Sequence, residues 1–216
     1  SKGSNVRPKE ILRECNNWQD FKSRLDPLTK KQKGDCFEAL TLYYLELSYK
    51  YQQLLKNVWL LREVPTKVLE KMGLERKDEG IDLVAEAQDG EFWAIQCKYR
   101  TDATQPVIRP DLGTFLDLLH RSECKLGLVC TTAESISKRL KIRAGIASIL
   151  GDVWQGLDEE FFRRLADFLD KNKKEPPEPY KPYPHQEQAL EKARTHFLKE
   201  SNTRGKLIMA CGTGKS

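Results

Sequence analysis

Apolar and polar positions change period several times along the chain, and each period predicts an element. Residues 11–25 and about 35–51 place apolar side chains at helical spacing, with a lysine-rich connection between them. The second segment is apolar around most of its circumference, which is typical of a largely buried helix. Residues 58–64 predict a strand, and residues 66–72 predict a short helix for which Gly73 is the C-terminal cap.

Two further strands joined by a tight turn are predicted at residues 81–87 and 92–99, where β-branched, aromatic and aliphatic residues surround Asp89 and Gly90. The rest of the pattern predicts a helix at 111–121, a strand at 125–132, a basic helix at 135–145, a strand at 146–150 and a helix at 157–170. This order of elements predicts an α/β fold with a mixed central sheet flanked by helices.

Three polar residues interrupt the predicted hairpin strands. Asp82 stands between Ile81 and Leu83, while Gln96 and Lys98 lie two residues apart and so share one face of their strand. A carboxylate, an amide and an amine that converge are the groups needed to hold a divalent cation beside a phosphodiester. A purely structural ion pair between Asp82 and Lys98 is the alternative.

The register of the hairpin decides whether these side chains meet. A two-residue turn would point Asp82 away from Gln96 and Lys98, because a shift of one residue reverses the faces of a strand. A three-residue loop over residues 88–90 places Asp82 opposite Gln96, with Gly90 in the left-handed conformation that such a loop requires. We therefore predict this loop and a positive φ at Gly90, although a bulge in either strand would also restore the faces.

A carboxylate also lies inside the second predicted helix. Glu38 is surrounded by apolar residues, where an unpaired charge is costly. A neighbouring lysine is the simplest partner, because a buried acid is usually satisfied by some cation.

Three segments resemble a known nuclease family. GIDLVA and IQCK are similar to the signature of PD-(D/E)XK nucleases in its Mrr-like form, where glutamine replaces the acidic residue before X-Lys. KGDCFE is similar to the segment in which a glutamate of the first core helix completes the metal site. The resemblance implies a restriction-endonuclease-like fold and Mg²⁺ bound by Asp82, Glu38, the Gln96 side-chain oxygen and the Cys97 carbonyl. It also implies that Lys98 acts on the attacking water and the transition state, so that Asp82, Gln96, Lys98 and Glu38 form the catalytic set.

Composition narrows the class of protein. Lys and Arg number 37 against 32 Asp and Glu, so the net charge of +5 permits a polyanionic partner such as double-stranded DNA. Six cysteines are scattered singly without a C-x-x-C pair, as expected for reduced thiols. No apolar run approaches about 18 residues, so we expect a soluble, cytoplasmic protein with no membrane partner.

Basic residues supply candidate DNA contacts in two places. Arg100 begins a polar loop that follows the hairpin, and four cations surround the predicted basic helix, namely Lys138, Arg139, Lys141 and Arg143. We consider these five residues as candidates for phosphate binding. A solvated helix face is the alternative for the four helical cations and the commoner use of such residues.

The chain changes character near its end. Residues 173–182 are rich in charge and proline and predict a linker between a first domain, residues 1–172, and a second segment, residues 183–216. In that segment a predicted strand runs into a loop that fits the phosphates of ATP and the accompanying Mg²⁺. The candidate ATP-binding residues of this loop are Gly212, Thr213, Gly214, Lys215 and Ser216.

Together with Gln186, about one helix earlier, this loop resembles the Q motif and Walker A motif that open a superfamily 2 helicase, a RecA-like motor. A nuclease domain followed by such a motor resembles ATP-dependent restriction-modification enzymes of the type ISP kind. The resemblance implies a DNA endonuclease joined, in the full-length chain, to the rest of the motor, a methyltransferase and a target-recognition part. A nuclease fold that only binds DNA for the motor is the competing hypothesis.

Overall fold

The computed structural model describes residues 6–77, 80–137, 140, 146–171, 191–192 and 195. The chain divides into two units, residues 1–177 and 178–216, and the fold below is that of the first. The predicted linker, the phosphate loop with Gln186, and Lys138, Arg139, Lys141 and Arg143 of the basic helix lie outside the described residues.

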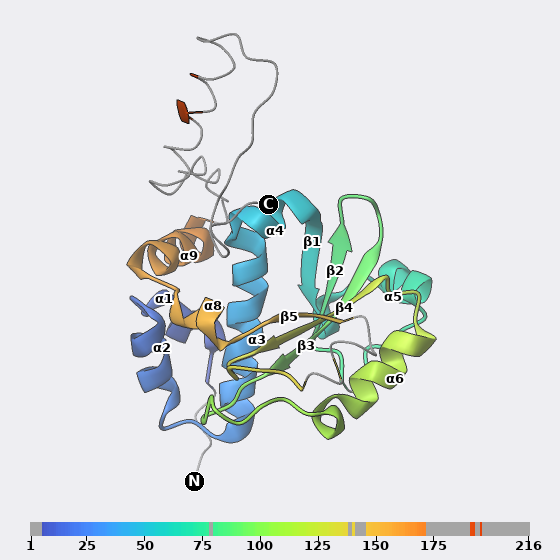
Figure 1. The fold of residues 1–216 in the computed structure, drawn as a ribbon, viewed down its shortest axis with the longest axis horizontal. Coiled ribbons are helices and arrows are strands. Elements are labelled where there is room, and N and C mark those ends of the chain that lie inside the picture. Colours follow the sequence, from blue (N-terminus) through green and yellow to red (C-terminus); the bar gives the residue numbers. More distant parts are fainter. Residues whose placement is uncertain are drawn as a thin grey trace. The chain divides into compact units, whose positions relative to one another are not determined.

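A mixed sheet of five strands, in the order β1-β2-β3-β4-β5, forms the centre of the described fold (Figure 1). The pairs β1–β2 and β2–β3 are antiparallel, whereas the pairs β3–β4 and β4–β5 are parallel. The strands are β1 (Leu55–Leu60), β2 (Leu83–Ala87), β3 (Phe92–Lys98), β4 (Leu126–Thr131) and β5 (Ile146–Ile149). The α/β prediction with a mixed central sheet is confirmed.

Helices cover both faces of this sheet. One set lies on the side of α3 and the other, with α5 and α6, on the opposite side (Figure 1). The first set is α1 (Pro8–Arg13), α2 (Trp18–Leu25), α3 (Lys30–Leu47), α4 (Tyr49–Leu54), α8 (Gly151–Gln155) and α9 (Glu159–Lys171). The second set is α5 (Thr66–Met72) and α6 (Gly113–Arg121), with the 3₁₀ turns η1 (Leu61–Glu63) and η2 (Arg109–Leu112).

Two hydrophobic clusters follow from the alternation of side chains along the strands. Leu83, Ala85 and Ile95 pack with α3 and its neighbours, whereas Val84 and Ala94 pack against residues of α5 and α6. Because the sheet buries apolar side chains on both faces, the sequences of its strands are nearly continuous apolar runs. The sheet is therefore fixed from both sides, and with it the ends of the strands.

The N-terminal helices differ from the predicted pattern because local caps interrupt it. The prediction of one helix over residues 11–25 is wrong: the Asn17 side chain accepts a hydrogen bond from Asp20 N, which starts α2 as a separate helix. The lysine-rich connection is also helical, because Thr29 and Gln32 form a capping box that starts α3 at Lys30. The predicted helix over about 35–51 is in fact divided between α3 and α4 at Ser48.

Other predicted elements hold with small shifts. The predicted strand at 58–64 is realised as β1 followed by η1, and α5 ends at Gly73, whose φ of 67° is left-handed as expected of a helix cap. The short helix α8 was not predicted. Among the described helices, none combines the length and hydropathy that crossing a bilayer requires.

The register of the hairpin is confirmed. Leu83 pairs with Ile95 and Glu86 with Phe92, and Ala87 N donates to Glu91 O at 2.8 Å, which leaves residues 88–90 as the loop. Gly90 has a φ of 85°. The turn chemistry therefore sets which faces of β2 and β3 carry the polar side chains.

Replacing Gly151 by Ala is expected to destabilise the fold by about 1–3 kcal/mol, because overpacking against backbone leaves little room to relax. A Cβ at this position would lie 2.6 Å from Thr132 O, at the end of β4. Gly34→Ala is the control: its Cβ meets nothing within 4 Å inside α3, so about 0.5–1 kcal/mol of stabilisation is expected. Urea unfolding of both variants measures the change in the free energy of unfolding. A change of the same sign in both variants would contradict the packing around Gly151.

Candidate functional site

Asp82 lies at the end of the β2–β3 pair, and its main chain is hydrogen-bonded to β3 on one side and to the turn η1 on the other. Its N–H donates to Ile95 O at 2.9 Å, and its carbonyl accepts a hydrogen bond from Leu61 N, also at 2.9 Å. The regular ladder begins only at the next residue, Leu83. These bonds fix the backbone of the candidate metal ligand at the edge of the paired region.

The Asp82 carboxylate is directed at β3. Its Oδ2 accepts a hydrogen bond from Cys97 N at 2.7 Å. Burial raises the pKa of Asp82 above its usual value, and the Cys97 N–H and the charge of Lys98 offset only part of this effect. The sequence assigned a possible metal contact to the Cys97 carbonyl, whereas the contact observed here is the Cys97 N–H, which positions the carboxylate.

Gln96 is buried without a hydrogen-bond partner for its side-chain oxygen. The residue is 5% exposed, and no described group donates to Oε1. It follows Ala94 on the face of β3 that packs in the second cluster, and Lys98 comes next on the same face. Because an unsatisfied buried oxygen costs about 1–3 kcal/mol, this atom marks a place for a donor or a cation.

Glu38 approaches the same centre from α3. Burial, together with the negative charges of Asp82 and Asp35, raises the pKa of Glu38 to about 8, although the charge of Arg62 opposes this rise. No ion pair within 4.0 Å or hydrogen bond joins Glu38 to a described residue, so the lysine partner suggested by its surroundings is not present. The Glu38 and Asp82 carboxyl groups are thus brought close enough to repel each other.

Lys98 adds a positive charge to this acidic group. It is partly buried at the end of β3, and its charge acts on both Asp82 and Asp111. It makes no ion pair within 4.0 Å with a described carboxylate, so the alternative of a direct structural pair with Asp82 is not realised. Its ammonium group is left available for another anion.

Arg100 is held by a neighbouring acid. Its Nη2 lies 2.5 Å from Asp111 Oδ2, which also accepts a hydrogen bond from Ile108 N. Burial acts to raise the pKa of Asp111, but these hydrogen bonds and the charges of Arg100 and Lys98 outweigh it and hold the pKa below its usual value. The assignment of Arg100 to DNA binding stays a prediction.

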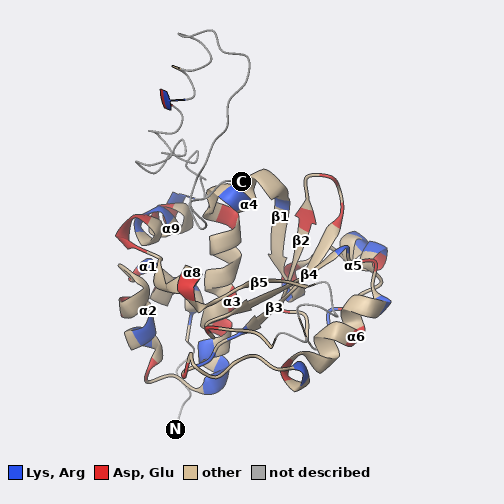
Figure 2. Ribbon diagram, viewed as in Figure 1, with Lys and Arg blue, Asp and Glu red and all other residues tan. Residues whose placement is uncertain are grey.

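Basic residues also gather at the start of α3, ahead of Glu38 (Figure 2).

Gly80 brings the chain to Asp82 through a close contact with α6. Its φ is 105°, and a Cβ there would lie 2.9 Å from Phe115 N and 3.0 Å from Thr114 Cβ. Only glycine combines this conformation with such a close backbone approach. In the sequence, the glycine of GIDLVA marked this position. Asp35 and Arg62, whose charges act on Glu38, were not predicted as site residues, because nothing in the sequence except their charge distinguished them.

The donor set fits a hard divalent cation such as Mg²⁺. Such ions prefer oxygen ligands, and the candidate set offers two carboxylates and the unpartnered Gln96 oxygen. Within the described residues, no three His, Cys, Asp or Glu side chains are close enough to hold a metal by themselves. Glutamine in the second position is consistent with this finding, since only two of the assigned side chains are acids.

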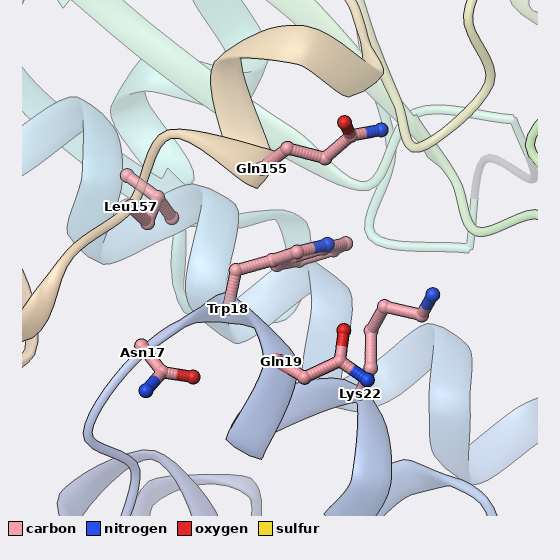
Figure 3. A pocket seen from close by; sticks show the side chains of 6 residues that line it. All are labelled: Asn17, Trp18, Gln19, Lys22, Gln155 and Leu157. Carbon is pink, nitrogen blue, oxygen red and sulfur yellow. The ribbon is translucent and has the colours of Figure 1, made fainter.

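A surface pocket of about 510 Å³ lies apart from this centre, between α2 and the end of α8 (Figure 3). Its lining is mostly amide and aromatic: Asn17, Trp18, Gln19, Lys22, Gln155 and Leu157. None of the predicted catalytic residues lines it.

The sheet order, the helices on both faces and the polar group at the parting of β2 and β3 define a restriction-endonuclease-like domain. Comparison with family models gives the same class: residues 47–144 match Mrr_cat_2, described as a restriction endonuclease. The chain carries a restriction endonuclease domain of this family.

Two solved structures resemble the chain. The first is the ATP-dependent type ISP restriction-modification enzyme LlaBIII bound to DNA, with a TM-score of 0.60 and 30% identity over 93% of this chain. The chain spans 12% of the length of that enzyme. The second, the DNA modification-dependent restriction endonuclease AspBHI, has a TM-score of 0.38 and 15% identity over 77% of this chain and 39% of its own. Comparison with curated proteins gives no match.

The stability of the metal-free protein is expected to fall as pH rises from about 5 to 8. The pKa of Glu38 is about 8 in the folded state against 4.5 for the free group, so over this range the folded state holds a proton that the unfolded state has lost. The slope contributed by this one proton approaches about 1.4 kcal/mol per pH unit. Urea unfolding in chelator at several pH values measures the slope.

Glu38→Gln should flatten this dependence, because the amide does not titrate. Glu10→Gln is the control, since that side chain is exposed on α1. A slope unchanged by Glu38→Gln would contradict the buried position of this carboxyl group.

Proposed function

We propose that this domain is a Mg²⁺-dependent DNA endonuclease that hydrolyses phosphodiester bonds. The observation that carries the proposal is the approach of the buried Glu38 and Asp82 carboxyl groups at the end of the β2–β3 pair, with the charge of Lys98 acting on Asp82. The unpartnered Gln96 oxygen lies on the same strand, two residues before Lys98. Family membership supports the class of reaction, and the likeness to a type ISP enzyme bound to DNA supports the substrate.

In the proposed hydrolysis, each residue of the site has a separate role. Asp82, Glu38 and Gln96 would hold Mg²⁺, which supplies positive charge to a phosphate oxygen when bound. Cys97 N holds the Asp82 carboxylate in place, at 2.7 Å. Lys98, which has no described ion-pair partner, orients the attacking water and stabilises the negative charge that grows on the phosphate. The water oxygen bonds to phosphorus and gives up a proton to the solvent, the bond from phosphorus to the leaving oxygen breaks, and that oxygen takes up a proton from the solvent.

The whole protein is proposed to couple this domain to an ATP-driven motor that moves along DNA. This part of the proposal rests on the Q motif glutamine and the phosphate loop in the sequence and on the likeness to an ATP-dependent type ISP enzyme. ATP would serve only the full-length motor, and a methyltransferase and target-recognition part would follow in the same chain.

Lys98→Ala is expected to lower Mg²⁺-dependent cleavage of plasmid DNA by at least about 100-fold, because it removes charge stabilisation made in the transition state. Folding and DNA binding should stay close to wild type. Lys125→Ala is the matched control: it is an exposed lysine just before β4, at the opposite end of the sheet. Wild-type protein that binds DNA but does not cut with Mg²⁺ would favour the competing hypothesis of an inactive DNA-binding module.

Mg²⁺ is expected to stabilise the folded wild-type protein, by about 2.7 kcal/mol at a hundredfold excess over the dissociation constant. Asp82→Asn should lose this gain, since it removes a charged ligand, whereas Asp117→Asn on α6 should keep it. The gain should be larger at pH 8.5 than at pH 6, because the pKa of Glu38 is near 8 and a protonated ligand must lose its proton to bind. Thermal unfolding with and without Mg²⁺ tests both points, and a full gain in Asp82→Asn would remove this residue from the metal site.

A further inference from the structure

The 3₁₀ turn η1 lies directly beside the catalytic centre. Leu61, its first residue, donates its N–H to the Asp82 carbonyl at 2.9 Å, and β1 before it pairs with β2 up to Leu60 and Leu83. The next residue is Arg62, whose side chain is 67% exposed. A cation is therefore attached to the backbone that holds the candidate metal ligand.

The backbone of Arg62 is also held from the other side. Arg76 Nη1 donates to the Arg62 carbonyl at 2.7 Å, and Arg76 Nη2 lies 3.3 Å from Thr66 Oγ1. The turn is thus fixed between Asp82 and Arg76. An arginine presented on such a fixed turn loses less conformational freedom on binding than one on a free loop.

Among the described residues, the guanidinium of Arg62 has only a long ion pair with its neighbour Glu63. Its Nε lies 3.8 Å from Glu63 Oε1, near the limit for an ion pair, and it makes none with Glu38 or Asp82 within 4.0 Å. Its charge nevertheless reaches Glu38, where it opposes the rise in that pKa. The side chain is therefore close to the acidic centre and still open to solvent, with donors free for an anion.

We propose that Arg62 binds a backbone phosphate of DNA next to the phosphate that is cleaved, and that Arg76 positions Arg62 for this contact. The inference rests on the proposed function, because it takes DNA as the substrate of the adjoining site. A guanidinium suits this role, since its planar donors match two phosphate oxygens. Such a contact fixes the position of the strand without reading its sequence.

The test is the salt dependence of DNA binding, measured with a fluorescent duplex in chelator so that no cleavage occurs. Arg62→Gln should lower the slope of log affinity against log salt by about 0.9, so the loss of affinity between 50 and 200 mM salt becomes about 3.5-fold smaller. Arg7→Gln is the matched control, because Arg7 is 69% exposed and is paired with Glu10 on α1. Arg62→Lys should restore most of the slope. Equal slopes for wild type and Arg62→Gln would overturn the inference.

Arg76 is tested through the double variant. If Arg76 acts through Arg62, then Arg62→Gln with Arg76→Gln has the same slope as Arg62→Gln alone. A further fall of about 0.9 would overturn the positioning role and make Arg76 a phosphate contact itself.

Cleavage by the wild type separates this inference from the proposed function. Wild-type cutting with Mg²⁺, together with unchanged slopes in Arg62→Gln, would refute the phosphate contact alone. A lowered slope in Arg62→Gln, combined with a wild-type protein that never cuts, would refute the nuclease proposal and leave the phosphate contact in place.

Discussion

The closeness of the Glu38 and Asp82 carboxyl groups is the constraint on which the rest of the site depends. Burial raises the pKa of each group, and the charge of Asp82 raises that of Glu38 further. The repulsion between two partly dehydrated carboxylates is removed only when one of them takes up a proton or when a cation binds between them. If the proposed metal binds here, it would displace the proton of Glu38, and metal binding, stability and pH would be linked in one equilibrium.

Main-chain hydrogen bonds hold this unfavourable pair in place. Asp82 is bonded through its N–H, its carbonyl and its carboxylate to Ile95, Leu61 and Cys97 respectively. Glu38 is carried by α3, which packs on the sheet through the first hydrophobic cluster. Since apolar burial yields roughly 25 cal/mol per Å² and the clusters cover both faces of the sheet, packing supplies the stability that the acidic pair removes.

The sequence predicted the hairpin loop but missed one local helix cap and one long-range contact. The loop at residues 88–90 followed from the demand for a left-handed residue, which only Gly90 meets without strain, and this loop fixed the pairing of Leu83 with Ile95 next to Asp82. The separate helices α1 and α2 were missed because apolar spacing continues through the Asn17 cap. Arg62 lies near Glu38 because α3 packs against β1, a contact that no periodicity in the sequence reports.

Gln96 decides how this centre differs from one with three acids. Its oxygen is buried and unpartnered, so it can serve a cation, but it brings no charge. A third carboxylate here would raise the repulsion on Glu38 and Asp82, and both pKa values would rise with it. The amide therefore allows the site to stay folded without metal at neutral pH. In the proposed function the missing charge would also weaken the attraction for Mg²⁺, and the oxygens of an approaching phosphate would complete the coordination of the ion.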